Sequence, residues 1–164
     1  MTTLFKDNGN VVKGVPGLLQ LVTFNISNEE FGLDILKVHE IIRMLEITRI
    51  PGAPQFVEGV INLRGRIIPV IDLRKRFNFE KKEPDKLTRI VVVEIEEKIV
   101  GFIVDSVSEV LRLPYSKVEP PPPIVGGIDS EYISGVGKLD NRLLILLDLG
   151  KLLTNKEIDI LDEV

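Results

Sequence analysis

Short apolar runs separated by polar turns recur along the chain. QLVTFNI (20–26) and RIVVVEI (89–95) are rich in β-branched and aromatic residues, and each leads into a polar turn, SNEE (27–30) or EEK (96–98). Such runs, bounded by turns, are typical of β-strands. In each half of the chain a strand that begins FGLDIL or VGFIVD comes next, and a further pair of strands follows it. The pattern predicts a mainly β protein.

Two of these runs lack the alternation of apolar and polar residues. RLLILL (142–147) does not alternate, so we expect a strand that is covered on both faces. RIIPVI (66–71) is similar, although Pro69 indicates a bulge or an edge position because proline cannot donate to a ladder. Several short strands in each half, joined by turns, are typical of a small barrel. The last strands of the halves predict two barrels that share one core.

The chain contains an internal repeat. A shift of 69 residues aligns 19–42 with 88–111 without a gap, and a shift of 76 residues aligns 56–77 with 132–153. Two blocks in the same order indicate a duplicated structural unit, with a first copy at about 19–77 and a second at about 88–153. The identities are Val22 and Val91, Ile26 and Ile95, Gly32 and Gly101, Val38 and Val107, Glu40 and Glu109, Gly59 and Gly135, Val60 and Val136, Leu63 and Leu139, Arg66 and Arg142, Asp72 and Asp148, Leu73 and Leu149, and Lys75 and Lys151.

Capping residues mark the few helical segments that we expect. Asp72 and Asp148 directly follow strands and are suited to cap a short helical turn. Thr154 and Glu157 have the spacing of a capping box, which predicts a C-terminal helix at about 155–162 that packs onto a barrel end.

The segments outside the two copies are polar or rich in proline. Residues 1–15 form an N-terminal tail whose order the sequence leaves open, and 16–164 form the folded domain. KKEPDK (81–86) reads as a solvated connection between the copies. The extra residues of the second copy lie around Pro120–Pro123, which is either a stiff extended spacer or a ligand for an SH3-type domain.

The residues that catalysis requires are scarce. The chain has no cysteine and one histidine, His39, which we interpret as a surface residue on a strand. No spacing of carboxylates around His39 suggests a metal site, and no glycine-rich phosphate loop is present, so we expect neither a metal nor a cofactor. Asp72 and Asp148 leave a cryptic hydrolase as an alternative, but capping explains both. We expect a protein that is not an enzyme.

The charge balance gives little support to nucleic-acid binding. The net charge is −4. We expect no signal peptide, because no basic segment is followed by a long apolar core, and no apolar run approaches the ~18 residues that cross a bilayer, so we expect a cytoplasmic protein. The arginines at 64 and 66, with Arg43, Arg49 and Arg74, could form a basic strip. Base stacking needs aromatic residues, and only 7 Phe and 2 Tyr are available. An RNA-binding barrel remains an alternative.

The turn at Arg64 differs from its counterpart in the second copy. Arg64-Gly65 corresponds to Asp140-Asn141, a pair that suits a two-residue turn, whereas arginine suits it poorly. If Arg64 needs a positive φ, the cost is of order 1 kcal/mol. Glu40 lies on a strand of the same copy and could hold the guanidinium. Arg64 is therefore either an anchor for a protein partner or an exposed residue with no role.

Four stretches resemble the CheW family of chemotaxis coupling proteins over residues 16–163. They are FGLDILKVHEI (31–41), IPGAPQFVEGVINLRGRIIPVIDLR (50–74), VGFIVDSVSEVL (100–111) and EYISGVGKLDNRLLILLDLGKLL (131–153). The resemblance implies two intertwined five-stranded SH3-like β-barrels that share a hydrophobic core, in agreement with the repeat. Neither a receiver domain nor a kinase core is indicated.

The resemblance also implies a function. It is that of a non-catalytic adaptor that joins methyl-accepting chemotaxis receptors to the histidine kinase CheA in a two-component signalling array at the inner face of the membrane. The residues expected to face the receptor's cytoplasmic tip, in the groove between the barrels, are Val38, Glu40, Gly59, Asn62 and Arg64. The residues expected to lie toward the kinase's regulatory domain are Gly101, Val107 and Val110. His39 matches no family signature.

Overall fold

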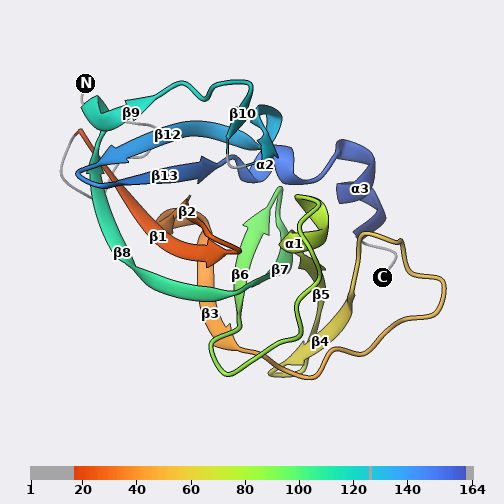
Figure 1. Ribbon diagram of the computed structural model, residues 1–164. Coiled ribbons are helices and arrows are strands. Elements are labelled where there is room, and N and C mark those ends of the chain that lie inside the picture. The colour runs from red at the N-terminus through yellow and green to blue at the C-terminus, as the bar shows by residue number, and fades with distance from the viewer. Residues whose placement is uncertain (1–16, 126, 162–164) are drawn as a thin grey trace.

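A computed structural model describes residues 17–125 and 127–161, and strands make up most of these ranges (Figure 1). The strands of the first copy are β1 (Leu18–Ile26), β2 (Glu29–Asp34), β3 (Val38–Arg43), β4 (Gly59–Leu63) and β5 (Arg66–Asp72). Those that follow are β6 (Arg89–Ile95), β7 (Lys98–Val104), β8 (Ser106–Pro114), β9 (Val118–Glu119), β10 (Ile124–Val125), β11 (Ile128–Asp129), β12 (Ile133–Leu139) and β13 (Arg142–Leu147).

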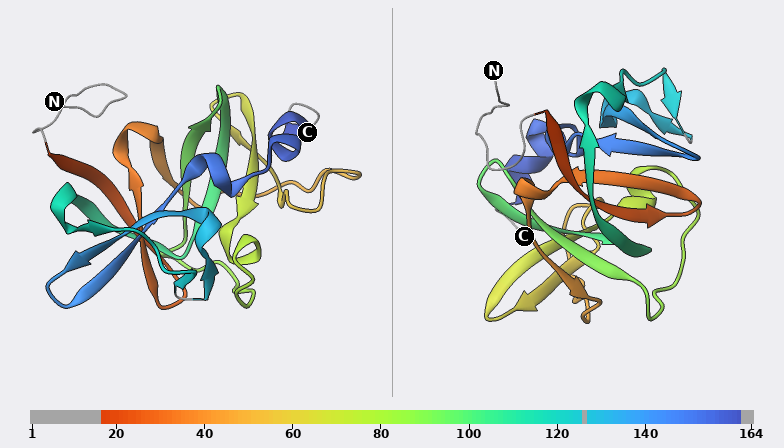
Figure 2. Two further views of the ribbon diagram at one scale, coloured as in Figure 1. Left: turned by 90° about the horizontal axis from the view of Figure 1, so that it is seen from above. Right: turned by 90° about the vertical axis from the view of Figure 1, so that its left-hand side faces the viewer.

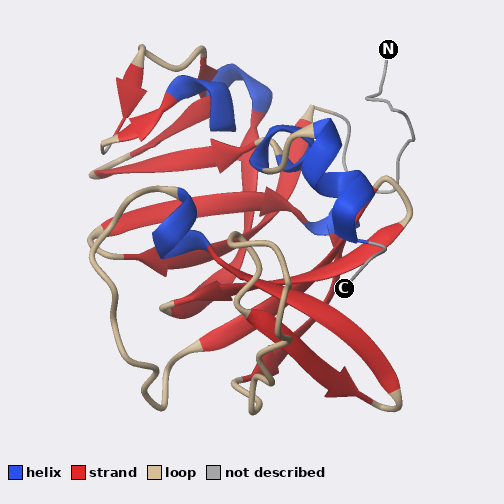
Figure 3. Cartoon of the chain, turned by 90° about the vertical axis from the view of Figure 1, so that its right-hand side faces the viewer, coloured by secondary structure: helices blue, strands red, loops and turns tan. Residues whose placement is uncertain are grey.

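The helical elements are short, as Figure 3 shows. The α-helices are α1 (Leu73–Arg76), α2 (Leu149–Leu152) and α3 (Asn155–Ile160), and the 3-10 turns are η1 (Ile35–Lys37), η2 (Tyr115–Lys117) and η3 (Ser130–Tyr132). No helix in the described part of the chain is long and apolar enough to span a membrane.

The strands form two main sheets that lie beside each other (Figure 2). One sheet has the order β8-β1-β2-β13-β12-β9, the other has the order β3-β6-β7-β5-β4, and β10 and β11 form a separate pair. The predicted mainly β class is confirmed. Two details differ from the expectation: β9 adds a sixth strand to one sheet, and among the described strands no continuous ladder closes either sheet into a barrel.

Each sheet contains strands from both copies. The hairpin β1–β2 of the first copy joins β8, β12 and β13 of the second, and the hairpin β6–β7 of the second joins β3, β4 and β5 of the first. The junctions are parallel, with Leu146 opposite Gly32 in one sheet and Val70 opposite Gly101 in the other. These two pairs are related by the sequence shifts of the repeat. The copies are therefore exchanged across the two sheets, and the same five-strand order occurs twice.

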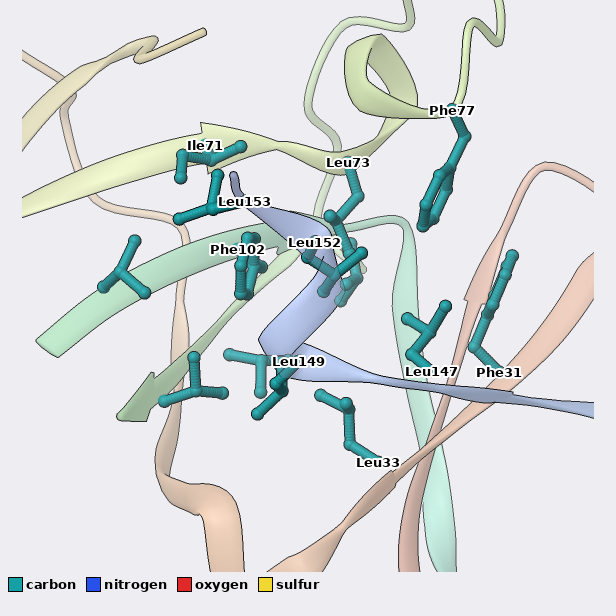
Figure 4. Packing of buried hydrophobic residues seen from close by; sticks show 14 of the residues in the cluster. Phe31, Leu33, Ile71, Leu73, Phe77, Phe102, Leu147, Leu149, Leu152 and Leu153 are labelled. Atoms are coloured by element: carbon teal, nitrogen blue, oxygen red, sulfur yellow. The ribbon is translucent and has the colours of Figure 1, made fainter. Parts of the chain in front are cut away.

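The buried faces of both sheets meet in one core (Figure 4). Phe31 stacks on Phe24 and on Phe77, with ring centroids 5.6 Å apart in each pair. Leu149, Leu152 and Leu153, in and after α2, enter the same cluster from the end of β13. Leu144–Leu147 are all buried, which confirms that this part of β13 is covered on both faces, whereas Arg142 and Leu143 at its start are exposed. In addition, each sheet has its own smaller cluster of buried apolar side chains, which is separate from the shared core.

The predicted helix caps are present. Asp72 Oδ1 accepts from Arg74 N at 2.9 Å, and Asp148 Oδ1 accepts from Gly150 N at 3.0 Å. Thr154 and Glu157 form the capping box, so α3 begins where the sequence predicted, and its described part ends at Ile160. The expected end of this helix at 162 and the tail at 1–15 lie outside the described residues.

Pro69 occupies an edge-like stretch of β5. The strand pairs with β4 from Arg66 onward, but its pairing with β7 begins only at Val70. A proline before Val70 therefore removes no hydrogen bond from that second ladder.

Candidate protein-interaction site

The Arg64-Gly65 turn has the conformation that arginine disfavours. Arg64 has φ 53° and Gly65 has φ 85°, which matches a type I′ hairpin turn between the paired residues Leu63 and Arg66. Asn62 Oδ1 accepts from Gly65 N at 2.8 Å and supports the turn. A positive φ at a residue with a Cβ costs about 1 kcal/mol. The positive φ considered for Arg64 is confirmed.

Glu40 holds the Arg64 guanidinium with two hydrogen bonds. Arg64 Nη1 donates to Glu40 Oε2 and Nη2 donates to Oε1, both at 2.7 Å. The bond to Arg64 lowers the pKa of Glu40, and the same contact raises the pKa of Arg64. The side chain of Arg64 is nevertheless 71% exposed, against 32% for Glu40. The guanidinium is thus fixed in orientation while most of its surface faces solvent.

This ion pair connects the two edge strands of the five-stranded sheet. Glu40 lies on β3 and Arg64 follows β4, and these are the two outer strands in the sheet order. Near the start of β4, Thr48 and Val60 exchange two backbone hydrogen bonds of 2.9 Å each. We call this junction, formed by Glu40, Arg64, Thr48 and Val60, the first seam. Gly59 borders it, because a Cβ there would lie 2.5 Å from Thr48 O.

The six-stranded sheet has an equivalent ion pair with an arginine from a different position. Glu109, the repeat partner of Glu40, accepts from Arg142 Nη2 at 2.6 Å, and Arg142 Nε also lies 3.2 Å from Glu30 Oε1. Arg142 corresponds to Arg66, not to Arg64, because Asp140 occupies the turn position. We call the contact of Glu109, Arg142 and Glu30 the second seam. The identity of Glu40 and Glu109 was the sequence signal for it, but the partner of Glu109 could not be assigned without the structure.

Exposed apolar side chains flank both seams. Ile41 and Ile67 are 37% and 59% exposed beside the first, and their repeat partners Val110 and Leu143 are 61% and 45% exposed beside the second. Large apolar side chains at equivalent exposed positions in both copies favour contact surfaces over chance exposure. Each sheet therefore presents an arginine–glutamate pair with apolar neighbours.

Four of the five residues expected to face a receptor lie in or next to the first seam, and the fifth, Val38, does not. Arg64 and Asn62 are exposed at the turn, and Glu40 is half-buried beneath the guanidinium. Val38 is half-buried and packs against the shared core. Gly59 is buried and does not contact a partner directly; its role is to let β4 approach Thr48 closely.

The structure does not bring the three residues expected to face the kinase together. Gly101 lies in the five-stranded sheet and is buried, with a hypothetical Cβ only 2.7 Å from Ile90 Cγ2. Val107 and Val110 lie on β8 in the other sheet. Val107 packs against the shared core, and only Val110 is well exposed. Direct contact with a partner is thus open to Val110, whereas Gly101 is buried in the other sheet and Val107 packs against the core.

The basic strip considered from the sequence loses one member in the structure. Arg74 is only 13% exposed, and its Nε and Nη2 donate to Asp105 at 2.9 and 2.6 Å. Burial by itself would raise the pKa of Asp105, but the bonds from Arg74 and from Ser27 N outweigh it and the pKa lies below its usual range. Arg74 is a structural cation and cannot face a nucleic acid.

The remaining candidates have structural partners. His39 Nε2 lies 2.9 Å from Glu94 Oε1 across neighbouring strands, with both side chains exposed. Burial raises the pKa of Asp72, while its Oδ1 caps α1. Within the described residues no group of three or more His, Cys, Asp or Glu side chains is arranged to hold a metal ion.

Comparison with known proteins identifies related chains. The family model of the CheW-like domain matches residues 20–157. The chemotaxis protein CheW of Klebsiella aerogenes is 41% identical over 145 residues, which cover 88% of this chain and 87% of the relative. The chemotaxis protein CheW of Treponema pallidum is 38% identical over 143 residues, covering 85% and 84% of the two chains.

A solved structure supports the same relationship. The crystal structure of the scaffolding protein TtCheW from Thermoanaerobacter tengcongensis is similar with a TM-score of 0.78 and 44% sequence identity. The similarity covers 85% of this chain and 96% of that one.

Proposed function

Because this chain belongs to the CheW-like domain family, we propose that it is a non-catalytic adaptor that couples methyl-accepting chemotaxis receptors to the histidine kinase CheA in a signalling array. Relatives over most of its length are chemotaxis proteins, and one with a known structure is a scaffolding protein. The adaptor is a cytoplasmic protein held at the inner face of the membrane through the receptors.

The first seam is the observation that carries the receptor assignment. Arg64 sits in a strained turn, is fixed by Glu40, and remains largely exposed. A guanidinium has five N–H donors, and the two bonds to Glu40 leave three for a partner. A pre-oriented arginine loses little freedom on binding, which favours it as an interface anchor. We assign the first seam to the cytoplasmic tip of the receptor, with Asn62 and Ile41 beside it.

The second seam supports a separate contact with the kinase. Val110 and Leu143 are exposed on β8 and β13, and Arg142 lies between Glu109 and Glu30. These residues belong to the six-stranded sheet, whereas Arg64 belongs to the other. Faces on different sheets allow two proteins to bind at once, and a scaffold needs this. We assign the second seam to the regulatory domain of CheA.

Coupling then requires geometry and no covalent step. The shared core fixes the two sheets relative to each other, so a receptor at one seam and a kinase at the other are held at a set distance. A change in the receptor reaches the kinase as a change in this arrangement.

Reversing the charge of Arg64 tests the proposal. Arg64→Glu places two carboxylates together at the first seam, so we expect loss of receptor pull-down and of receptor-dependent kinase control. Exposed ion pairs contribute about 0–1 kcal/mol, so the melting temperature should change little. Asp140→Arg, at the matching turn of the second copy, is the control and should retain receptor binding. Retained binding by Arg64→Glu would refute the assignment, and collapse of its fold would make Arg64 a structural residue.

A further inference from the structure

A hollow of about 500 Å³ opens at one end of the six-stranded sheet, and its lining includes none of the residues of the two seams. Its apolar floor includes Leu21 and Leu146, and its rim includes Glu94 of β6, Glu96 of the β6–β7 turn and Gly150 of α2. In Figure 1 the tip of β6 points toward α2. We call this the Gly150 hollow. Its volume lies in the range of ligand sites, which is roughly 300–1,000 Å³.

The repeat provides a filled counterpart of the Gly150 hollow. At the matching place in the first copy, Arg74 occupies the position of Gly150 and Asp105 occupies that of Leu36. Arg74 donates two hydrogen bonds to Asp105, and Asp105 Oδ2 also accepts from Ser27 N at 2.8 Å. Both side chains of this ion pair are at least 85% buried, since 13% and 15% of them are exposed. An arginine thus closes the space between α1 and the β1–β2 turn.

The second copy lacks both partners of that ion pair. Gly150 has no side chain, and a Cβ built there would meet only Asp148 Oδ1 within 4 Å, at 3.4 Å. Leu36 replaces the carboxylate and is 63% exposed. The absence of the arginine therefore leaves the matching space open and apolar at its base.

Acidic side chains predominate on the rim of the hollow, and the described residues that line it include no arginine. Asp34, Glu94, Glu96 and Asp148 line it, and Lys37 is the one cation among the lining residues. Glu94 also contacts His39, and Asp34 and Asp148 each use one oxygen to accept from a backbone N–H. The potential at the rim is complementary to a cation.

The turn that carries Glu96 is itself strained. Glu96 has φ 47° and Glu97 has φ 71°, conformations that Asn or Gly adopt at lower cost. As at Arg64, the turn keeps charged side chains where its backbone favours others. Such outliers are concentrated at functional positions.

We propose that the Gly150 hollow binds an arginine side chain of a partner protein, with an apolar neighbour of that arginine resting on the exposed Leu36. The guanidinium takes the place that corresponds to Arg74 in the first copy and donates hydrogen bonds to the rim carboxylates. The methylene stem lies on the leucine floor, as long cationic side chains do on apolar surfaces. The site is a third contact surface, separate from the two seams.

A peptide titration tests this site directly. The probe is acetyl-Leu-Arg-Leu-amide, added to the full chain while backbone amide signals are followed by NMR. We expect saturable shifts at Leu36, Glu96 and Gly150. The analogue with neutral citrulline in place of arginine should bind roughly tenfold more weakly, because charge-assisted hydrogen bonds are lost. Shifts elsewhere, or equal binding of both peptides, would overturn the proposal.

A variant that fills the hollow from within is the matched control. Gly150→Arg combined with Leu36→Asp rebuilds the ion pair of the first copy, so peptide binding should disappear while receptor pull-down through Arg64 is unchanged. Glu96→Gln is a milder variant at an exposed turn, and it should weaken the peptide severalfold without affecting the fold. Undiminished peptide binding by folded Glu96→Gln and by the folded double variant would contradict the site.

Discussion

Arg64→Gly separates the contribution of Arg64 to binding from its contribution to stability. The substitution relieves the positive φ of 53°, which costs about 1 kcal/mol in a residue with a Cβ. It removes an exposed ion pair worth about 0.2–1 kcal/mol. Glycine also gains freedom in the unfolded chain, which costs a further ~0.4–1 kcal/mol. These terms nearly cancel, so the free energy of unfolding should stay within about 1 kcal/mol of the parent value.

Receptor binding should respond quite differently. Without the guanidinium that Glu40 orients, we expect the affinity for a receptor cytoplasmic fragment to fall roughly tenfold or more, the scale of an interface anchor. Calorimetric titration measures the affinity, and urea unfolding measures the stability of the same sample. Arg64→Ala is the matched control, because it removes the same contact but keeps the strained φ, and it should be somewhat less stable than Arg64→Gly.

Two results would refute this reasoning. Unchanged affinity in both variants would show that Arg64 is not an anchor. A loss of more than about 2 kcal/mol in Arg64→Gly would show that the first seam holds the sheet together, since an exposed ion pair cannot account for that much.

Two further predictions concern the framework of the fold. Asp105→Asn leaves Arg74 buried without its counter-charge, so urea unfolding should show a loss of about 3 kcal/mol. In the parent protein the pKa of Asp105 is lower in the folded state than in the unfolded state. The stabilisation by Asp105 is therefore present above pH ~4 and is lost as the pH falls through the folded pKa. If the parent protein lost no more stability than Asp105→Asn in a pH series, the assignment would be contradicted. Gly59→Ala brings a Cβ to within 2.5 Å of Thr48 O, so we expect a loss of about 1–3 kcal/mol and weaker receptor binding. Gly150→Ala, whose Cβ meets nothing closer than 3.4 Å, should change stability far less in the same urea assay, and equal stability of the two variants would argue against a tight seam.

Local features of the fold could be predicted from the sequence because short-range physics determines them. The caps at Asp72, Asp148 and Thr154 depend on residues two or three positions away, and all three were predicted. The run at 142–147 predicted a strand covered on both faces, and Leu144–Leu147 are buried, because burial leaves a direct pattern in the residues. The duplication was visible because two blocks kept their order.

The sites depended on contacts between distant segments, which residue patterns do not encode. Arg64 and Glu40 could be paired in advance because both lie in the first copy, but Arg142 reaches Glu109 from the position after the turn. The burial of Arg74 was missed because its partner Asp105 lies 31 residues away on the far side of a hairpin. The same limit explains why Gly101 was grouped with Val107 and Val110, although the exchange of hairpins places it in the other sheet.

The exchange of hairpins also bears on how the chain matures during synthesis. When the first copy has left the ribosome, β1 and β2 can pair only with each other. Their other sheet neighbours, β8 and β13, come later in the sequence. The six-stranded sheet is complete only after β13 emerges, so a nascent chain must hold an unpaired apolar hairpin through most of translation. Long-range pairing of this kind slows folding and leaves strand edges open to aggregation. Dependence on chaperones is the expected consequence, and neither copy can be produced as a stable half.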